Sequence, residues 1–235
     1  MRRDPLLAAI CHDLRAPLAA VTMGANFVLQ TTPEDESAAR QRKILEAMLR
    51  SCAQMERLVR NFGDLSEIDG GAVALRPAEV DARELAQIAV EHAQGVAQTK
   101  KVSLVADVPD ERVPISADRD RLLRALAHLV DNALRVAPPE TVVVVGVKKE
   151  DDGVAISVSD EGAGIPPAMK KNLFDREWHA KNSGRAGSGF GLAIVKGFTD
   201  AHGGHVDVTS KKGATTIAIV LPTPKEVSRP RSRRR

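Results

Sequence analysis

Apolar residues recur at spacings of three and four over the first 70 residues, and this period indicates two long amphipathic helices. The first helix is predicted over residues 4–30, with an apolar stripe formed by Leu7, Ile10, Leu14, Leu18, Val21, Ala25 and Val28. Residues 31–37 contain Pro33 and are mostly polar, so they are predicted to form a loop. The second helix is predicted to end near Glu67. Its seam alternates steps of four and three, as in a coiled coil, with Ser51 as the one polar interruption: Ile44, Met48, Ser51, Met55, Leu58, Phe62 and Leu65.

Two such helices joined by a short loop predict an antiparallel hairpin, which cannot bury both apolar stripes by itself. A symmetric homodimer that forms a four-helix bundle would bury them. A plain dimerisation hairpin is the simpler alternative, but it gives no purpose to the polar residues of the first helix that are described below.

After Asp69-Gly70-Gly71 the pattern changes to short β-branched runs that alternate with helical segments. Helices are predicted over residues 83–98, 118–136 and 188–201, with Asp118 as a cap and Pro138-Pro139 as a stop for the second of them. Strands are predicted over residues 102–107, 113–117, 141–149, 154–159, 205–210 and 215–221, and residues 162–187 are predicted to form a glycine-rich loop. The fold class is therefore α+β: a helical hairpin followed by an α/β sandwich, with helices on one face of a mixed, largely antiparallel sheet.

Composition and charge add a third region. The chain has 235 residues and a net charge of +3, but residues 223–235 alone carry +5, which leaves −2 for the rest. The predicted regions are thus 1–69, 70–222 and a basic tail at 223–235. The tail is expected to be a solvated end, with binding to nucleic acid or an anionic surface as the alternative. No run approaches the roughly 18 apolar residues of a membrane span, which predicts a cytoplasmic protein.

The segment Ile10–Leu18 carries the first candidate chemistry. It places His12, Asp13 and Arg15 on an apolar helix, with Pro17 five residues after the histidine. Proline removes a helical hydrogen bond, so we expect a kink here. A neutral imidazole is available as a nucleophile near pH 7, and we interpret His12 as a phosphate acceptor. Cys11 and Cys52 lack metal-ligand spacing and are expected to pack as small apolar residues.

Three segments of the second region carry further candidate chemistry. His128 and Asn132 lie four residues apart and share a helix face, with Arg135 beside Asn132. An amide oxygen such as that of Asn132 suits Mg²⁺, and Arg135 could meet a phosphate. An ordinary amphipathic helix is the alternative for this segment.

The other two segments are rich in glycine. Asp160-Glu161-Gly162-Ala163-Gly164-Ile165 follows a strand, where the aspartate can accept a hydrogen bond from an exocyclic amine and glycine lets backbone approach a flat ring. A plain turn explains this segment nearly as well. Gly187-Ser188-Gly189-Phe190-Gly191-Leu192 opens a helix and offers amide donors to phosphate. A dinucleotide fingerprint is excluded because no strand precedes these glycines.

In this order, the three segments resemble the ATP-binding domain of sensor histidine kinases of two-component systems, which is of the GHKL type. Ile10–Leu18 resembles the phosphoacceptor box of the same family, and Leu173-Phe174-Asp175-Arg176 stands where the family has its phenylalanine box. The resemblance covers residues 5–222. It implies an ATP-dependent protein-histidine kinase that autophosphorylates His12 and passes the phosphoryl group to an aspartate of a response-regulator receiver domain.

The resemblance also implies a role for each matching residue. His12 would be the phosphoacceptor, Asp13 would orient its ring and take up its proton, and Arg15 would steady the added charge. Asn132 would bind Mg²⁺, with His128 and Arg135 beside it. Asp160 would recognise the adenine amine. The remaining nucleotide contacts would come from the two glycine-rich segments and the phenylalanine box: Gly162, Gly164, Ile165, Phe174, Gly187, Gly189, Gly191 and Leu192. The lid charge would come from among Lys170, Lys171, Arg176, Lys181 and Arg185.

Some positions depart from the family pattern. Ala16 stands where members often have a hydrogen-bonding residue that positions water, so weak phosphatase activity is expected. His128 replaces an asparagine, and the glutamate that related ATPases use to activate water is absent. Trp178 occupies a place more often held by phenylalanine. Only eleven residues precede His12, so we expect either a catalytic fragment of a longer sensor or a small kinase that takes its input from a partner or from the tail. Two alternatives to the kinase remain: an ATP-binding pseudokinase or scaffold, and a regulator that binds nucleic acid through the tail.

Overall fold

The computed structural model describes residues 5–71, 73–151, 153–175 and 190–222. These residues fall into two compact units, of which the first ends its continuous run at Val73 and the second begins at Ala74. Within the described ranges, no helix has both the length and the apolar character needed to cross a membrane.

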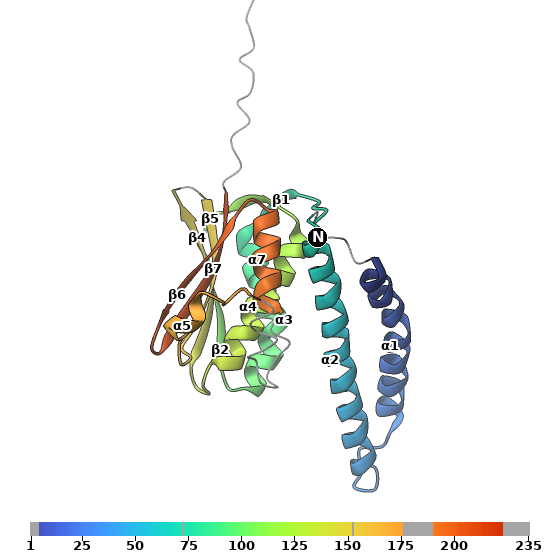
Figure 1. Cartoon of the computed structure of the whole chain (residues 1–235). Helices are drawn as coiled ribbons and strands as arrows, with labels where there is room; N and C mark the ends of the chain where they lie inside the picture. The colour runs from blue at the N-terminus through green and yellow to red at the C-terminus, as the bar shows by residue number, and fades with distance from the viewer. Residues whose placement is uncertain (1–4, 72, 152, 176–189, 223–235) are drawn as a thin grey trace, which may run out of the picture. The chain divides into compact units, whose positions relative to one another are not determined.

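The first unit is the predicted helical hairpin. Helix α1 (Pro5–Thr31) continues past Pro17, and helix α2 (Ala39–Asp69) packs beside it in the opposite direction (Figure 1). Arg42 of α2 fastens the turn, because its Nη1 donates to the carbonyl oxygens of Thr32 at 2.9 Å and Leu29 at 3.3 Å. Asp35 in the connection accepts the Ala38 backbone N–H at 3.0 Å, just before α2 begins.

The interior of the hairpin is narrow. Leu45, Cys52 and Val59 of α2 are buried at seven-residue spacing, and Cys11 of α1 is buried with them. Both cysteines are free and buried, as expected of small apolar residues. Much of the predicted seam lies beside this buried line and is exposed. Ile44 comes one residue before Leu45, and Met48, Met55 and Phe62 each come three residues after a member of the line; they are 54%, 45%, 46% and 38% exposed. The hairpin thus buries one apolar line by itself and leaves a second one open.

The second unit contains a five-stranded sheet in the order β2-β4-β5-β7-β6. The strands are β2 (Ser103–Asp107), β4 (Val142–Glu150), β5 (Gly153–Asp160), β6 (His205–Lys211) and β7 (Ala214–Pro222). β2 and β4 pair in parallel, and the other three pairs are antiparallel. The predicted mixed, largely antiparallel sheet is confirmed.

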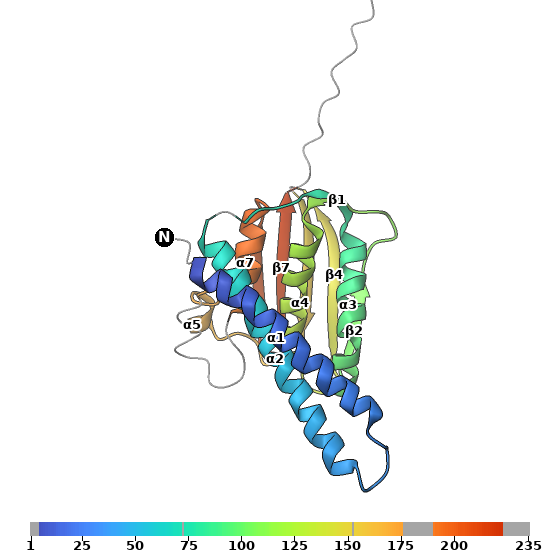
Figure 2. The same ribbon diagram turned by 90° about the vertical axis from the view of Figure 1, so that its right-hand side faces the viewer.

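Three helices cover one face of this sheet, with α4 between the other two (Figures 1 and 2). They are α3 (Ala82–Thr99), α4 (Arg119–Val136) and α7 (Gly191–Ala201). The core lies between the helices and the sheet, and its largest fully buried side chains include Leu126, Leu129, Ile156, Phe198 and Ile219. As predicted, Asp118 caps α4, because its side chain accepts the N–H groups of Asp120 and Arg121, each at 3.1 Å.

Two short elements were not predicted. Strand β1 (Ala78–Asp81) pairs with β3 (Pro114–Ala117) in a separate two-stranded sheet, and α5 (Pro167–Lys170) is a single turn inside the segment predicted as a loop. β1 has four residues, of which two are exposed and only Val80 is β-branched, so no apolar alternation marks it. Its last residue, Asp81, caps α3 through the Arg83 N–H at 3.1 Å.

Candidate functional site

Helix α4 holds a group of polar side chains on one face. His128 and Asn132 are both half-buried, while Leu129 and Ala133 beside them face the core. An Nη2–H of Arg135 donates to Asn132 Oδ1. The structure therefore brings together the three α4 residues that the sequence singled out, with an amide oxygen and a guanidinium in direct contact.

The start of α7 lies against this group. A Cβ placed on Gly191 would be 3.2 Å from His128 Nδ1, so a larger residue would crowd the imidazole. Leu192, the next residue, is buried. The glycine at 191 thus lets the first turn of α7 approach α4 closely.

Several predicted site residues lie outside the described residues. These are Gly187 and Gly189, the candidate lid residues Arg176, Lys181 and Arg185, and Trp178. The basic tail at 223–235 lies outside them as well. Phe174 is described and is half-buried, next to the buried Leu173.

Asp160 stands at the end of β5 and is only 6% exposed. Burial raises the pKa of its carboxyl above the ordinary value, and the hydrogen bond that Oδ1 accepts from Gly162 N–H at 2.8 Å lowers the pKa in part. Among the described residues, Gly162 is the one hydrogen-bond donor to this carboxylate. Asp160 Oδ2 is therefore free to accept a hydrogen bond from a ligand.

The glycines after Asp160 are explained by contacts within the protein. A Cβ on Gly162 would lie 2.7 Å from Asp160 Oδ1. Gly164 has φ +84, and a Cβ there would lie 2.4 Å from the Lys211 carbonyl oxygen. Both positions exclude a side chain before any ligand is present, so the loop is shaped by its own packing.

Two residues of this site were missed from the sequence. Ile165 N–H donates to Ser210 Oγ at 2.8 Å, and that hydroxyl lies 3.0 Å from Thr215 Oγ1. Thr215 is buried and stands opposite Asp160 in the β5–β7 register. Ser210 and Thr215 thus fasten the loop of residues 161–165 to the β6–β7 hairpin. Their role follows from strand register, which the sequence pattern did not reveal.

The candidate acceptor, His12, belongs to α1 in the other unit, and its side chain lies outside the described residues. Asp13 and Arg15 are exposed on the same helix. The Arg15 guanidinium lies over Gly63 of α2, since a Cβ on Gly63 would be 3.5 Å from Nη2. The next residue, Asp64, is buried and was not singled out from the sequence.

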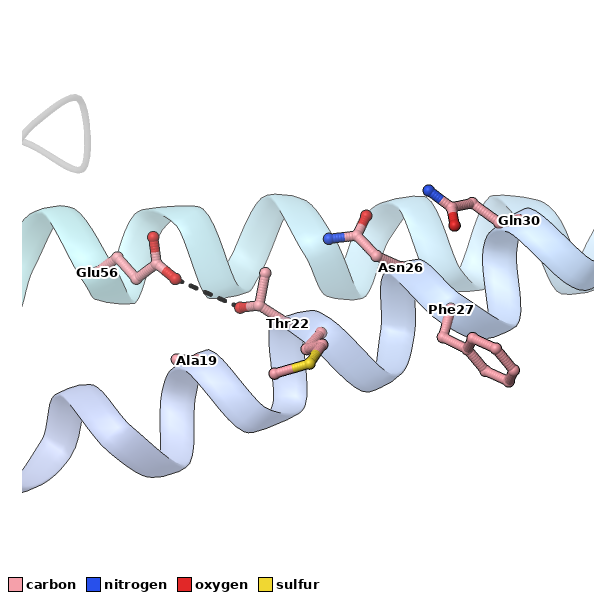
Figure 3. A pocket seen from close by; sticks show the side chains of 7 residues that line it. Ala19, Thr22, Asn26, Phe27, Gln30 and Glu56 are labelled. Carbon is pink, nitrogen blue, oxygen red and sulfur yellow. Dashed lines mark hydrogen bonds between the residues drawn. The ribbon is translucent and has the colours of Figure 1, made fainter.

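An open groove of about 510 Å³ lies further along the hairpin. It is lined by Ala19, Thr22, Met23, Asn26, Phe27 and Gln30 of α1 and by Glu56 of α2. Thr22 Oγ1 donates to Glu56 Oε1 at 3.4 Å, and Figure 3 shows Thr22, Asn26 and Gln30 directed toward α2 and Phe27 directed away. Met23 and Phe27 are 70% and 66% exposed.

Two family models match the chain. The model described as "His Kinase A (phospho-acceptor) domain" matches residues 2–71. The model described as "Histidine kinase-, DNA gyrase B-, and HSP90-like ATPase" matches residues 117–225. The first contains His12 and the second contains Asn132, Asp160 and Gly191.

Curated relatives extend the same likeness over almost the whole chain. Sensor protein DivL of Caulobacter vibrioides is 31% identical over 223 residues, covering 94% of this chain and 28% of the relative. Sensor-like histidine kinase SenX3 of Mycobacterium tuberculosis H37Rv is 28% identical over 225 residues, covering 94% and 54%. The chain spans about a quarter to three-fifths of the length of the curated relatives it matches.

Solved structures give the same result. Full-length ShkA in complex with AMPPNP has a TM-score of 0.73 and 27% identity, covering 94% of this chain and 46% of that one. The mycobacterial sensor histidine kinase MprB has a TM-score of 0.54 and 30% identity, covering 63% and 99%.

Proposed function

The chain belongs to the sensor histidine kinases, as their catalytic core, and on this premise we propose that it uses ATP to phosphorylate its own His12. The phosphoryl group then passes to an aspartate of a response-regulator receiver domain. One observation carries the proposal: in the second unit, Gly191 at the start of α7 lies against His128 of α4, and Gly162 in the loop after Asp160 lies against Val136 at the end of α4. The matched phosphoacceptor helix lies in the first unit.

In this proposal the nucleotide lies between the loop after β5 and the α4 polar group. Asp160 Oδ2 accepts a hydrogen bond from the adenine amine, and the loop of residues 161–165 lines the base. The phosphates extend toward Gly191, whose helix terminus favours negative charge. Phe174 and Leu192 add apolar contacts beside the base and the first turn of α7.

The metal belongs to the substrate, as Mg²⁺-ATP. An amide oxygen such as Asn132 Oδ1 suits Mg²⁺, which keeps phosphate oxygens and waters as its other ligands. The described residues hold no group of three or more His, Cys, Asp or Glu that could bind a metal. Arg135 now donates to Asn132 Oδ1 and would turn to a phosphate when the metal takes that oxygen.

The chemical step is an in-line transfer. A lone pair on an imidazole nitrogen of His12 attacks the γ-phosphorus, the bond from phosphorus to the β,γ-bridging oxygen breaks, and ADP leaves. The other ring nitrogen releases its proton to Asp13, which leaves a neutral phosphoimidazole. Such transfers depend mostly on positioning and electrostatic stabilisation. Arg15 balances part of the charge that the ring gains.

The proposal includes a homodimer and two kinds of partner. Exposed apolar residues at Ile44, Met48, Met55 and Phe62 give the hairpin a second face to bury, and a second copy would cover it as a four-helix bundle. A response-regulator receiver domain accepts the phosphoryl group, and a sensor or input partner sets the activity.

The test separates nucleotide binding from acceptance of phosphate. Purified chain is incubated with Mg²⁺ and ATP labelled on the γ-phosphate, alongside His12→Gln and Asn132→Ala. We expect acid-labile, base-stable label on the unaltered chain only. His12→Gln should still bind a fluorescent ATP analogue, while Asn132→Ala should bind it weakly in the presence of Mg²⁺. An unaltered chain that binds ATP without incorporating label would contradict the kinase proposal and favour a pseudokinase.

A further inference from the structure

Helices α4 and α7 pack antiparallel, and contacts join them at three levels. At the nucleotide end, Gly191 lies against His128. In the middle, the guanidinium carbons of Arg121 and Arg124 lie 5.2 and 5.9 Å from the ring centroid of Phe198. At the far end, His202 follows the last residue of α7 and contacts Asp118, the cap of α4. The last contact has no role in the proposed function.

Both ring nitrogens of His202 are hydrogen-bonded. Nε2 lies 2.9 Å from the Asp118 backbone nitrogen, and Nδ1 lies 2.7 Å from the Phe198 carbonyl oxygen. The Asp118 N–H can only donate, so Nε2 must carry a lone pair. The Phe198 carbonyl can only accept, so Nδ1 must carry the hydrogen. These bonds select the neutral imidazole with its hydrogen on Nδ1, because the charged ring would turn an N–H toward the Asp118 N–H.

Asp118, the hydrogen-bond partner of His202, has a fixed position of its own. Asp118 is buried, and its carboxylate accepts Arg76 N–H at 2.9 Å in addition to the two α4 N–H groups. Burial raises the pKa of this carboxyl, but the hydrogen bonds from the Arg76, Arg121 and Asp120 N–H groups and the charge of Arg121 together outweigh burial, so the pKa lies below the ordinary value. Both carboxylate oxygens are therefore engaged.

The chain after His202 is fixed as well. Gly203 has φ +72, and a Cβ on Gly204 would lie 2.2 Å from the Val220 carbonyl oxygen. The Gly204 N–H donates to the Thr199 carbonyl at 3.0 Å. Because the exit from α7 is locked against β7, the His202 ring has a fixed place from which to reach Asp118.

We propose that His202 is a positioning residue for nucleotide binding. Its neutral imidazole fixes the end of α7 to the cap of α4, and α7, as a rigid helix, thereby holds Gly191 against His128 at the opposite end. His202 does not touch the nucleotide. The effect on nucleotide binding rests on the proposed function, whereas the hydrogen-bonded state of the ring does not.

The charged groups around His202 determine how a fall in pH affects its hydrogen bond with Asp118. Asp118 would favour a charged ring, but its oxygens are taken by backbone N–H groups. Arg121 and Arg124 on the Phe198 ring oppose a second cation nearby, and on α7 Asp200 is paired with Lys196 at 2.9 Å. Protonation of His202 therefore breaks the bond to Asp118 and loosens the end of α7.

The first test needs no nucleotide. Histidine ¹⁵N NMR of the full chain, with His202 assigned from the His202→Gln spectrum, reports which ring nitrogen carries the hydrogen. We expect the neutral form protonated on Nδ1 at about pH 7.5. A ring protonated on Nε2, or on both nitrogens, at that pH would overturn the proposal.

The second test measures affinity for a non-hydrolysable ATP analogue from about pH 7.5 to 5.5. In His202→Gln, the side-chain amide can offer its oxygen near the place of Nε2 and cannot titrate in this range. We expect unaltered chain to lose about tenfold in affinity on acidification, as one buried N–H loses its partner, and His202→Gln to lose clearly less. Asp160 titrates equally in both, so it cannot produce the difference.

Two variants complete the second test. His202→Leu removes the acceptor, and we expect about tenfold weaker binding already at pH 7.5, while thermal unfolding shows that it is folded. His92→Gln alters an exposed histidine on α3 and should match the unaltered chain. Equal acid losses in unaltered chain and His202→Gln would overturn the proposal. An unaltered chain that binds no analogue at pH 7.5 would instead contradict the proposed function, while the NMR result still tests the His202 contact.

Discussion

At the scale of single residues, Asp160, the proposed adenine-binding residue, lowers the stability of the fold at neutral pH. Burial raises its pKa, so the folded state binds a proton more readily than the unfolded state does. For such a group, folding stability falls as the pH rises through the raised pKa. At neutral pH the charged Asp160 therefore destabilises the fold. This same charged carboxylate is the group proposed to recognise adenine.

We predict that Asp160→Asn weakens binding of an ATP analogue by about tenfold or more, because a charge-assisted hydrogen bond is lost. The same variant should unfold at a higher temperature at pH 7. Glu161→Gln, an exposed neighbour, serves as the control and should change neither quantity. Calorimetry and thermal unfolding check both outcomes. A variant that is less stable than the unaltered chain at neutral pH would contradict this account of Asp160.

Ala16 offers only a methyl group on α1, four residues after His12. We predict that the chain dephosphorylates a receiver domain slowly and that Ala16→Thr speeds the reaction by about tenfold through positioning of water. Ala20→Thr, one turn further along, is the matched control. Loss of phosphate from a labelled receiver over time gives the rates. Rapid dephosphorylation by the unaltered chain would show that the residue at 16 does not limit this activity.

Asp81 shows how one side chain can hold several elements. It caps α3, accepts the Val113 N–H at 3.2 Å, and pairs with Arg83 Nη2 at 2.8 Å. The hydrogen bond from Arg83 lowers the pKa of Asp81 to about 2, although burial acts against it. Since this pKa is depressed, the stabilisation is present above the ordinary value of 3.8 and disappears as the pH falls toward 2.

We predict that Asp81→Ala lowers the free energy of unfolding by about 2 kcal/mol at pH 7, because a cap and a buried N–H lose their acceptor. The difference from the unaltered chain should shrink as the pH approaches about 2. Asp81→Asn keeps a capping oxygen but loses the ion pair, so it should cost less. Urea unfolding at several pH values measures each quantity. A difference that grows toward low pH would contradict the assignment.

At the scale of elements, periodicity located every long helix to within about three residues, because each buries one stripe against a single neighbour. The strands after residue 141 were equally clear from their β-branched runs. β1 was not predicted because its four residues form a strand only by pairing with β3. α5 was not predicted because a single helical turn is too short to show a period. Ser210 and Thr215 were not identified for a related reason. Their position beside Ile165 and Asp160 depends on strand register, which is a long-range property.

The exposed apolar residues of the hairpin allow a test of the proposed dimer. Met55 is 46% exposed in the single chain, and the proposed dimer would bury it. We predict that Met55→Glu weakens self-association by about tenfold or more, because an unpaired charge would be buried. Gln54→Glu adds the same charge one residue away and should leave the dimer intact. Sedimentation at several concentrations gives both constants. Equal association of the two variants would place the interface elsewhere.

At the scale of the whole molecule, one chain carries the two halves of the proposed phosphoryl transfer. The three candidate nucleotide-binding segments and the candidate phosphoacceptor segment could be recognised from the sequence, because each is short and local. The contacts that hold these segments in place could not be predicted from the sequence. The contacts of Asp118 with His202 and of Ser210 with Ile165 join residues 84 and 45 positions apart. The sequence therefore indicates candidate reacting groups more readily than it predicts the contacts that hold them in place.

The most direct measurement is the position of the phosphoryl group on the chain after reaction with Mg²⁺-ATP. Peptides prepared and analysed by mass spectrometry in alkaline solution keep phosphohistidine intact. We predict modification at His12, and none in a chain that carries Asn132→Ala. Phosphate at another histidine, or at a hydroxyl group with His12 unmodified, would contradict the central claim.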